Sequence, residues 1–344
     1  MKALTFQGIE NLRVEELPDP RPKAPGDVVV EVLVAGVCGS DLHPYHGREA
    51  GLDLGTVMGH EFVGRVRAIG TQVESWQPGD LVLSPFTTNC GRCRFCRSGL
   101  TSRCEHGQLF GWLEQGAGLD GCQAELVRVP LADSTLVAVP EGAPLEAVLF
   151  AGDILATGYY GVDAAGGGPG ASVAIVGCGP VGLMAVLAAR QLGATEIVAV
   201  DRLPERLELA ASFGARAVDL DGPELTDCLS SADAVVEAVG TPQATRLAYD
   251  LARPGATLCA VGVHTEPQFA ISPGEIYDKN LTYRAGRCPV RHYLERVLPL
   301  AVEHSAKLSA LISHRLPLSE GPRGYELFAR RLDGCTKVVL LPGG

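Results

Sequence analysis

Residues 173–182 read VAIVGCGPVG, an apolar run that leads into three glycines, Gly177, Gly179 and Gly182, and continues as the helical pattern VGLMAVLAARQLG. This order predicts a strand, a tight glycine turn and a helix. Strand-like and helical patterns keep alternating after it, in EIVAVD, ERLELAASFGA, ADAVVEAVG and ATLCAVGV. Such alternation is typical of a parallel sheet with crossover helices, the doubly wound α/β fold.

The segments on either side have a different pattern. Residues 1 to about 150 carry short β-rich runs broken by glycine and proline, such as DVVVEVLVAGV at 27–37. They predict a mostly antiparallel β domain. The last apolar run, KVVLLP, can return to that domain as a strand. We therefore expect an α/β protein with domains at 1–153 and 154–286 and a C-terminal return at 287–344.

The glycine turn has the sequence context of a dinucleotide-binding site. The first glycine permits the tight turn, the second lets the backbone approach a pyrophosphate, and the third lets the helix pack on the strand. Pro180 fits the first helical turn, where a missing N–H costs no hydrogen bond. Asp201 ends the next apolar run, 19 residues after Gly182. Its carboxylate would bind ribose hydroxyls and repel a 2′-phosphate, so it favours NAD as the cofactor. Arg202 keeps NADP as an alternative, because a guanidinium group pairs well with phosphate.

Composition excludes several classes of function. A chain of 344 residues with 46% hydrophobic and 20% charged residues predicts a folded protein of about two domains. Its 29 basic and 40 acidic residues give a net charge of −11, so no overall attraction to nucleic acid or to an anionic membrane is expected. No apolar run has the length of a membrane helix, and the opening MKALTFQG has no basic leader. We expect a soluble, cytoplasmic protein.

Eleven cysteines, an odd number without a secretory leader, favour reduced thiols or metal ligands over a disulfide framework. Four of them, Cys90, Cys93, Cys96 and Cys104, form a C-x2-C-x2-C-x7-C run. Thiolates at this spacing can surround one tetrahedral Zn²⁺ and leave no position open, as in structural zinc sites. Disulfides and an iron–sulfur cluster are the alternatives, since ferredoxin-type cysteine runs look similar.

Three further segments each contain one possible metal ligand: Cys38 in GVCGSDLH, His60 in MGHEF and Asp153 in FAGDILATG. Taken singly, a cysteine is most often a small buried side chain, an aspartate before a helix an N-cap, and a histidine part of the core. Taken together, sulfur, nitrogen and oxygen donors with an open fourth position fit a catalytic zinc site.

In this order, a Cys-Gly-Ser-Asp-x-His segment, a Gly-His-Glu segment, a four-cysteine lobe and a later GxGxxG resemble the zinc-dependent medium-chain alcohol dehydrogenase family. The resemblance covers essentially the whole chain. It implies a GroES-like β domain that holds a catalytic zinc and a structural zinc, the latter in the cysteine lobe at 90–104, and a Rossmann NAD-binding domain inserted before the C-terminal return. It also implies a homodimer or homotetramer that transfers hydride between NAD and a small alcohol, aldehyde or ketone.

Carried onto this sequence, the resemblance implies that Cys38, His60 and Asp153 bind the catalytic zinc, with Glu61 beside them as an occasional ligand or a nearby charge. The best-known members have cysteine where Asp153 stands, and aspartate there resembles a branch of formaldehyde dehydrogenases and related bacterial alcohol dehydrogenases. A carboxylate donates less electron density than a thiolate, so the zinc would be the stronger Lewis acid. A formaldehyde dehydrogenase or dismutase with tightly held NAD is therefore one alternative.

Asp41 resembles the residue that orients the imidazole of the ligand His60, and Ser40 and His43 resemble a proton relay. For His43, a solvated loop histidine is the alternative. A catalytically silent nucleotide-binding relative would have lost zinc ligands, and none is missing here. The zinc-free quinone and enoyl reductases of the same superfamily lack both the cysteine lobe and the three ligands.

The resemblance also implies nucleotide contacts beyond the glycine turn, for which core packing or surface charge is the alternative. The expected cofactor-binding residues are Thr157, Gly177, Gly179, Pro180, Val181, Gly182, Asp201, Arg202, Arg206, Val239, Val263 and Arg287. The candidates for walls of the substrate pocket, although such residues are more often ordinary packing residues, are Phe86, Leu109, Phe110 and Trp112.

Overall fold

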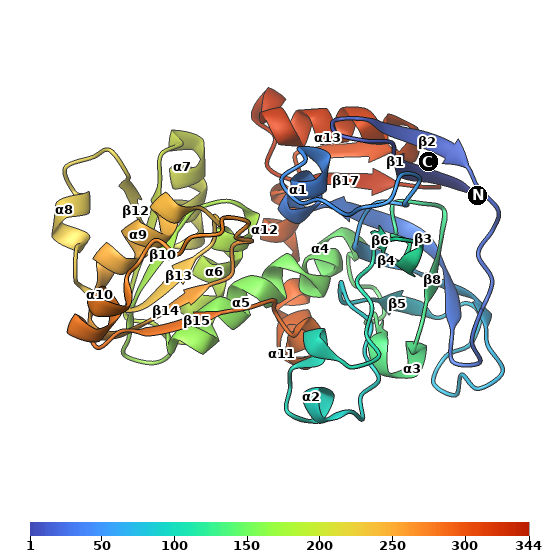
Figure 1. Cartoon of the computed structure of the whole chain (residues 1–344), viewed down its shortest axis with the longest axis horizontal. Helices are drawn as coiled ribbons and strands as arrows, with labels where there is room; N and C mark the ends of the chain where they lie inside the picture. Colours follow the sequence, from blue (N-terminus) through green and yellow to red (C-terminus); the bar gives the residue numbers. More distant parts are fainter. Residues whose placement is uncertain (344) are drawn as a thin grey trace. The chain divides into compact units, whose positions relative to one another are not determined.

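The computed structural model describes residues 1–343, which divide into two compact units. The first unit combines Met1–Asp153 with the segment from Pro289 onward, and the second is Ile154–Cys288 (Figure 1). Within residues 1–343, no helix is long and apolar enough to cross a membrane.

The first unit is built on a seven-stranded sheet with the order β16-β17-β3-β4-β5-β9, in which β8 also pairs with β3. Every pairing in it is antiparallel except that of β16 with β17. The central strand β3 (Val28–Val37) carries the valine-rich run and is buried along most of its length. The remaining strands of this sheet are β4 (Glu61–Ile69), β5 (Leu81–Leu83), β8 (Leu126–Val129), β9 (Val137–Ala138), β16 (His314–Pro317) and β17 (Val338–Leu341). The predicted mostly antiparallel β domain is confirmed.

The C-terminal run returns to this sheet, as the apolar pattern of KVVLLP suggested. Strand β17 pairs with β3, with Val338 opposite Val37. Apolar side chains from both ends of the chain, among them Leu4, Tyr325 and Leu340, share one hydrophobic cluster. The core of the first unit is therefore assembled from segments that are far apart in sequence.

Shorter elements complete the first unit. Its other strands are β1 (Lys2–Phe6), β2 (Leu12–Glu16), β6 (Trp112–Glu114) and β7 (Ala117–Leu119). Its helices are η1 (Gly39–Asp41), α1 (Leu42–Tyr45), α2 (Arg94–Arg97), η2 (Thr101–Arg103), α3 (Ala132–Thr135), α4 (Leu145–Leu149), η3 (Phe150–Gly152), α11 (Val290–Glu303), α12 (Ser305–Ala310), η4 (Leu318–Glu320), α13 (Gly321–Arg330) and η5 (Leu332–Gly334).

The second unit is a six-stranded, all-parallel sheet with the order β12-β11-β10-β13-β14-β15. Numbered from its first strand, this order is 3-2-1-4-5-6, the Rossmann arrangement, whose topological switch point lies between β10 and β13. The strands are β10 (Ser172–Val176), β11 (Glu196–Asp201), β12 (Arg216–Asp219), β13 (Ala232–Glu237), β14 (Ala252–Ala260) and β15 (Thr282–Ala285). The helices are α5 (Ile154–Ala165), α6 (Pro180–Gln191), α7 (Pro204–Phe213), α8 (Leu225–Cys228), α9 (Pro242–Leu251) and α10 (Pro273–Asp278). The predicted doubly wound parallel sheet is confirmed.

Candidate functional site

Cys38, His60, Glu61 and Asp153 converge in the first unit, although they come from three distant segments. One ligand atom from each lies within 4.8 Å of the others, and all four residues are buried. Cys38 follows β3, His60 and Glu61 stand at the start of β4, and the antiparallel pairing of Gly36 with Glu61 brings these strand ends together. Asp153 follows the short helix η3. The sheet pairing therefore explains why ligands so far apart in sequence meet.

The contacts among these side chains orient a sulfur, a nitrogen and an oxygen toward one point. Cys38 Sγ lies 3.3 Å from Asp153 Oδ2, and His60 Nε2 lies 3.4 Å from the same oxygen. On the other side of the imidazole ring, His60 Nδ1 lies 3.1 Å from Asp41 Oδ1. Asp41 is itself held by the backbone N–H of Cys38, which donates to its Oδ2 at 2.9 Å. A carboxylate behind the imidazole is the usual arrangement around a metal-bound histidine.

Charge in this cluster favours a bound cation. Burial raises the pKa of the Cys38 thiol to about 11, and the nearby charge of Asp153 adds to the effect. Burial would lower the pKa of His60, but the charge of Asp41 and hydrogen bonds to Asp153 and Asp41 raise it well above its ordinary value. Burial would also raise the pKa of Asp153, yet its contacts with His60 lower it. A divalent ion would displace the thiol proton and offset the acidic groups, so this donor set fits zinc.

Glu61 is held by a partner that the sequence patterns did not reveal. Lys337 Nζ lies 2.5 Å from Glu61 Oε2 and 2.8 Å from Oε1, and both side chains are only 2% exposed. Burial would lower the pKa of Lys337, but the charge of Glu61 raises it. For Glu61, burial raises the pKa more than Lys337 lowers it. Both carboxylate oxygens of Glu61 therefore contact Lys337, next to the donor atoms of Cys38, His60 and Asp153.

Two hydrogen-bonded side chains outside the cluster stabilise the loop that carries Asp41. Gln123 Nε2 donates to the backbone oxygen of Gly36 at 2.9 Å, and it also lies 3.5 Å from Asp41 Oδ2. Tyr325, which is buried, donates its hydroxyl to Gln123 Oε1 at 2.9 Å. This chain of contacts fixes the loop that carries Asp41, and sequence analysis did not single out either Gln123 or Tyr325.

Ser40 and His43 lie in the turn that follows Cys38. Ser40 Oγ is 3.1 Å from His60 Nε2, the nitrogen that faces the other donors. His43 lies in α1, and its buried Nδ1 has no hydrogen-bond partner among the described residues. Burial lowers the pKa of His43, and the positive charges of Arg48 and His46 lower it further. The His43 imidazole is therefore neutral at neutral pH and able to accept a proton.

The four aromatic and aliphatic candidates for a substrate pocket have different surroundings. The Phe86 ring meets the His60 ring edge to face, with centroids 6.2 Å apart, so it does border the cluster. Phe110 is only 1% exposed and packs against Phe62 in the core, which supports ordinary packing rather than a pocket wall for this residue. Leu109 and Trp112 are half-buried.

The four cysteines of the lobe at 90–104 also come together. Their sulfur atoms lie within 4.8 Å of one another, and all four are free thiols, so the disulfide alternative is excluded. Backbone N–H groups donate to three of the sulfurs; that of Cys96, for example, donates to Cys93 Sγ. Together with a further backbone contact, this bond lowers the pKa of Cys93 to about 6. Such hydrogen bonds stabilise thiolates, so the lobe fits a closed four-sulfur zinc site.

In the second unit, the glycine turn lies at the switch point of the parallel sheet. Gly177 has a φ of 93°, and a Cβ there would lie 2.5 Å from Val239 Cγ2. A Cβ on Gly182 would lie 1.8 Å from the carbonyl oxygen of Gly177. Helix α6 begins at Pro180, directly after Gly179. The side-chain-free backbone therefore permits both the left-handed turn and the close packing of the helix on the strand.

Asp201 connects the end of β11 to this turn. Its Oδ2 accepts the backbone N–H of Cys178 at 2.8 Å, and its Oδ1 accepts those of Arg202 and Leu203 at 2.8 and 3.1 Å. Arg206 Nη1 lies 3.8 Å from Oδ2. An ionised carboxylate has about four acceptor positions, so three backbone bonds leave room for a ligand hydroxyl.

The remaining candidates for nucleotide contacts lie in different parts of the second unit. Val239 faces Gly177, and Val263 lies against Gly240, so both are near the switch point, and both side chains are exposed. Thr157 lies in α5, Val181 in the first turn of α6, and Arg287 is exposed beyond β15.

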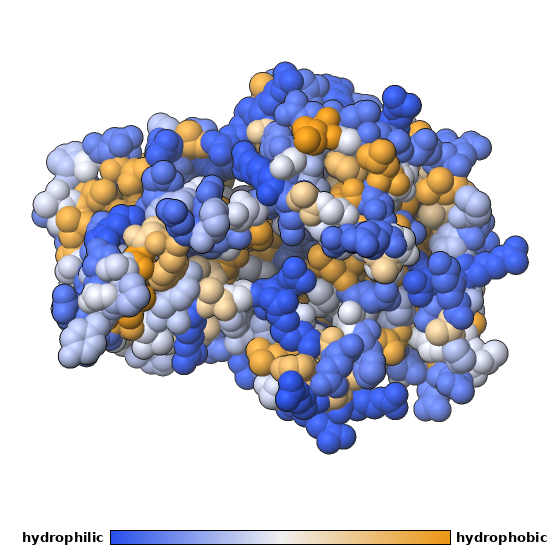
Figure 2. Space-filling model, viewed as in Figure 1, coloured by the Kyte–Doolittle hydropathy of each residue, from blue (hydrophilic) through white to orange (hydrophobic). Residues whose placement is uncertain are grey.

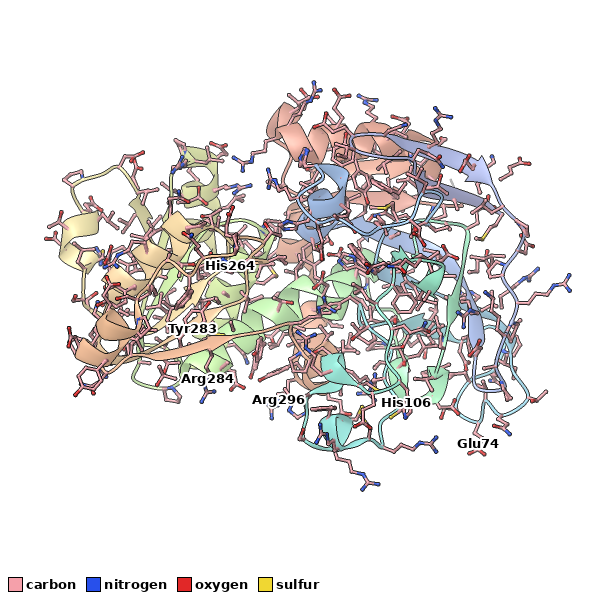
Figure 3. The ribbon with its side chains drawn as sticks, in the orientation of Figure 1. Glu74, His106, His264, Tyr283, Arg284 and Arg296 are labelled. Atoms are coloured by element: carbon pink, nitrogen blue, oxygen red, sulfur yellow. The ribbon has the colours of Figure 1, made fainter. Side chains whose placement is uncertain are left out.

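A buried acidic residue at the same edge of the sheet was missed by sequence analysis. Glu237 ends β13 and is fully buried. Its Oε1 accepts the backbone N–H groups of Val239 and Gly240 at 2.8 and 2.7 Å, and its Oε2 lies 2.8 Å from His264 Nε2. Figure 3 labels His264 in this unit. Hydrogen bonding to Glu237 raises the pKa of His264, although partial burial opposes the rise. The pair ties the segment after β14 to the end of β13.

Comparison with known proteins identifies the family of this chain. Residues 24–141 match the alcohol dehydrogenase GroES-like domain, and residues 180–303 match the zinc-binding dehydrogenase domain. The chain is 41% identical to the zinc-type alcohol dehydrogenase B of Aspergillus flavus, over 95% of this chain and 78% of that protein. It is 42% identical to the solved structure of an alcohol dehydrogenase of Thermus sp. ATN1, with a TM-score of 0.92 over 99% of both chains. The chain is thus a zinc-binding dehydrogenase, and it belongs to the zinc-dependent medium-chain alcohol dehydrogenase family.

Two more distant relatives bear on substrate and cofactor. The chain is 31% identical to the formaldehyde dismutase of Pseudomonas putida, over 100% of this chain and 98% of that protein. It is 28% identical to a zinc-binding dehydrogenase of Sinorhizobium meliloti whose structure holds NADP, with a TM-score of 0.85 over 99% of both chains.

Proposed function

We propose that this chain is an NAD-dependent alcohol dehydrogenase in which Cys38, His60 and Asp153 hold a catalytic zinc ion. The observation that carries this proposal is the convergence of sulfur, imidazole and carboxylate donors with Asp41 fixed behind the imidazole. A second zinc ion would be held by the four thiols of the cysteine lobe. The family match supports an oxidoreductase, while the ligand set rests on the geometry of these residues.

The chain's own residues divide the work of the reaction between them. A bound zinc ion supplies Lewis acidity, which favours ionisation of a substrate hydroxyl and polarises a carbonyl. Ser40 Oγ, beside His60 Nε2, is placed to accept the hydroxyl proton. His43 would take that proton onward; its buried Nδ1 has no hydrogen-bond partner among the described residues, and burial lowers its pKa, which supports this role. Asp41 keeps the His60 ring oriented throughout.

For the cofactor we propose NAD rather than NADP. The carboxylate of Asp201 lies at the end of β11, where it would meet the adenosine ribose and repel a 2′-phosphate. Arg206, 3.8 Å from that carboxylate, is partly neutralised by it and is therefore less available to a phosphate group. Because the structure of one relative holds NADP, activity should be measured with both NAD and NADP.

An enzyme of formaldehyde dehydrogenase or dismutase type is the second candidate. It is favoured by Asp153 in the third ligand position and by the full-length similarity to a formaldehyde dismutase. If NAD stays bound through successive turnovers, the purified protein will carry nucleotide absorbance without added cofactor. A catalytically silent relative is disfavoured because Cys38, His60 and Asp153 are all present and close together.

The test combines metal analysis with an activity screen. We expect two zinc ions per chain, and NAD reduction with at least one of a panel of primary alcohols, secondary alcohols, polyols and formaldehyde, lost after chelation. Cys38→Ser and Asp153→Ala are expected to abolish turnover with the fold kept, and Cys38→Ser to lower the metal content to about one zinc per chain. Cys335→Ser is the matched control, because this buried thiol of the same unit is not a member of the cluster. Near-normal turnover in Cys38→Ser or Asp153→Ala would contradict the ligand assignment.

A further inference from the structure

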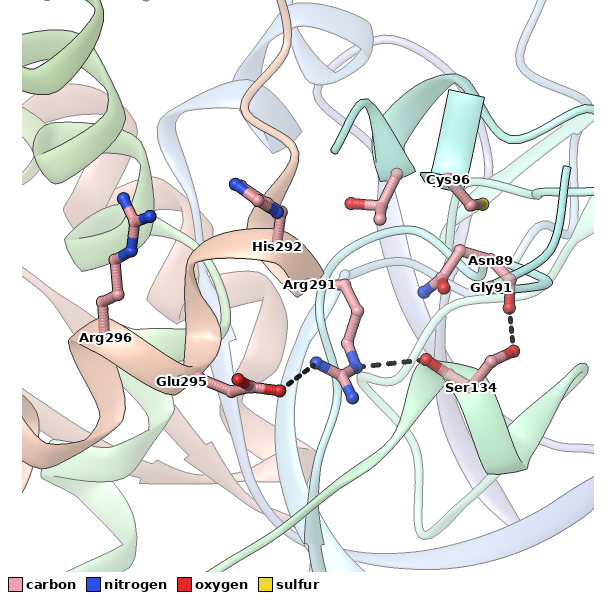
Figure 4. Close-up of a pocket in the computed structure, with 9 residues that line it drawn as sticks. Asn89, Gly91, Cys96, Ser134, Arg291, His292, Glu295 and Arg296 are labelled. Atoms are coloured by element: carbon pink, nitrogen blue, oxygen red, sulfur yellow. Dashed lines mark hydrogen bonds and ion pairs between the residues drawn. The ribbon is translucent and has the colours of Figure 1, made fainter. Parts of the chain in front are cut away.

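A second polar pocket in the first unit shares no residue with the cluster around Cys38. It lies between the cysteine lobe and the N-terminal end of α11, and its volume is about 380 Å³. The residues that line it are Asn89, Gly91, Cys96, Thr101, Ser134, Arg291, His292, Glu295 and Arg296 (Figure 4). We call it the lobe pocket. The dehydrogenase reaction proposed above uses none of these residues except Cys96, as a ligand of the structural zinc.

Two buried polar atoms line the lobe pocket without a hydrogen-bond partner among the described residues. They are Asn89 Nδ2 and Thr101 Oγ1, and the two residues are only 1% and 8% exposed. In Figure 4 the amide of Asn89 lies on the side of the pocket that faces Arg291. Buried polar groups in native proteins are nearly always hydrogen-bonded, so an unpartnered one indicates a ligand, an ion or a water. An amide nitrogen can only donate, and a hydroxyl can donate, so both fit an acceptor ligand.

The charged groups around the pocket are mainly positive. Arg291 donates through Nε to the backbone oxygen of Ser134 at 3.1 Å, which fixes its guanidinium against the lobe. Its Nη1 lies 3.6 Å from Glu295, the one acidic side chain of the lining, which is 81% exposed and therefore strongly screened. Arg296 also belongs to the lining and is labelled in Figure 3, but in Figure 4 its guanidinium turns away from Asn89, and it lies 5.6 Å from the centroid of the Tyr293 ring. On the face shown in Figure 2, the tip of the lobe around α2 is predominantly hydrophilic.

The backbone adds to this positive field. The first turn of α11 includes Arg291 and His292, and a helix N-terminus carries a partial positive charge and unpaired N–H groups. The His292 ring packs closely on the lobe at Gly99, where a Cβ would come within 3.2 Å of it. Gly99 has a φ of 82°, which also favours glycine there. The start of α11 is thereby held against the lobe.

We propose that the lobe pocket binds a small oxyanion, the phosphate or carboxylate group of a small molecule, between Asn89, Thr101 and Arg291. The donors Asn89 Nδ2 and Thr101 Oγ1 would bind the oxygens directly, and Arg291 would offset the charge. A pocket of about 380 Å³ is within the size range of small-molecule sites, so there is room for an organic remainder. This site is independent of the proposed dehydrogenase reaction, and its occupancy is measured without turnover.

The experiment titrates inorganic phosphate, and acetate as the carboxylate probe, into the zinc-loaded protein by calorimetry, with chloride at equal ionic strength as the reference. Thr101→Val removes the hydroxyl and keeps the shape, and Asn89→Asp replaces the amide donor with a negative charge. Arg330→Gln is the matched control, because it removes one exposed positive charge of the same unit from α13, outside the pocket.

We expect saturable binding of phosphate or acetate to the wild type, weakened about tenfold or more by Thr101→Val and by Asn89→Asp and unchanged by Arg330→Gln. Without the oxyanion, Thr101→Val is expected to unfold at or above the wild-type temperature, because the unpartnered hydroxyl is gone; at saturating oxyanion the order reverses. The proposal is overturned if neither probe binds better than chloride, or if Thr101→Val binds as tightly as the wild type. Should Asn89→Asp fail to fold, the comparison with Thr101→Val still decides the outcome.

Discussion

Replacing Lys337 with methionine tests the buried ion pair beside the candidate catalytic zinc site. Lys337 Nζ contacts both carboxylate oxygens of Glu61 at 2.5 and 2.8 Å, and the two side chains are almost completely excluded from solvent. Methionine has a similar length and no charge, so the substitution leaves packing nearly intact and removes only the ammonium group. Glu61 then remains buried without its cation.

The expected loss of stability follows from this geometry. Removing one partner of a buried ion pair costs about 3–5 kcal/mol, because the other charge is left without compensation. At roughly 2–4 °C per kcal/mol for a domain of this size, the midpoint of thermal unfolding should fall by roughly 6–20 °C. Replacing both partners by apolar side chains of similar volume is often neutral, so Lys337→Met combined with Glu61→Met should recover most of the loss.

Tryptophan fluorescence isolates the relevant unit, because both tryptophans, Trp76 and Trp112, lie in the first unit. Guanidinium unfolding followed by this signal gives the free energy of unfolding by linear extrapolation. Lys2→Met, which removes an exposed lysine of the same unit, should change stability by less than about 0.5 kcal/mol. A loss below about 1 kcal/mol in Lys337→Met, or no recovery in the double variant, would refute the reasoning.

The remaining predictions concern the cysteine lobe and the second unit. Cys93→Ser should lower the unfolding midpoint of the first unit by at least about 5 °C and remove one zinc per chain by elemental analysis; unchanged thermal stability would count against a structural metal. In an NMR titration, the pKa of His264 should lie above its ordinary value, and in Glu237→Gln it should fall back toward that value. Identical titration curves for the two proteins would contradict this prediction. Because the folded-state pKa of His264 is raised, its contribution to stability is present below its unfolded-state pKa and is lost as the pH rises through the folded-state value. Asp201→Asn should lower the ratio of kcat/KM with NAD to kcat/KM with NADP about tenfold, because the charge that repels a 2′-phosphate is removed.

The parts of the molecule that local pattern controls could be predicted from the sequence. The alternation of strands and helices after residue 171 was sufficient to predict the parallel sheet, and the spacing of Cys90, Cys93, Cys96 and Cys104 was sufficient to predict that the four thiols meet. Both depend on short separations, in which chain geometry leaves few alternatives. Cys38, His60 and Asp153 were grouped by the chemistry of their donor atoms and by the family resemblance, because their spacing alone does not define a site.

The residues that were missed act across long separations. Lys337 and Glu61 are 276 positions apart, and Tyr325 and Gln123 are 202 apart, so no periodicity connects them. Their pairing follows from the return of the last strand to β3, a property of the tertiary fold. Sequence alone left Phe110 open for the related reason that an aromatic residue beside the cysteine lobe has the same sequence context whether it faces a ligand or the core.

The return of β17 to β3 has a consequence for synthesis on the ribosome. The second unit is one uninterrupted stretch, Ile154–Cys288, so all six of its strands have been translated while β17 is still missing from its neighbour. Until Lys337 emerges, Glu61 has no ammonium group to meet and the Val37 end of β3 has no partner on that side. The nascent polypeptide can thus complete its inserted portion first, and the unit that carries Cys38, His60 and Asp153 closes only after β17 has been translated.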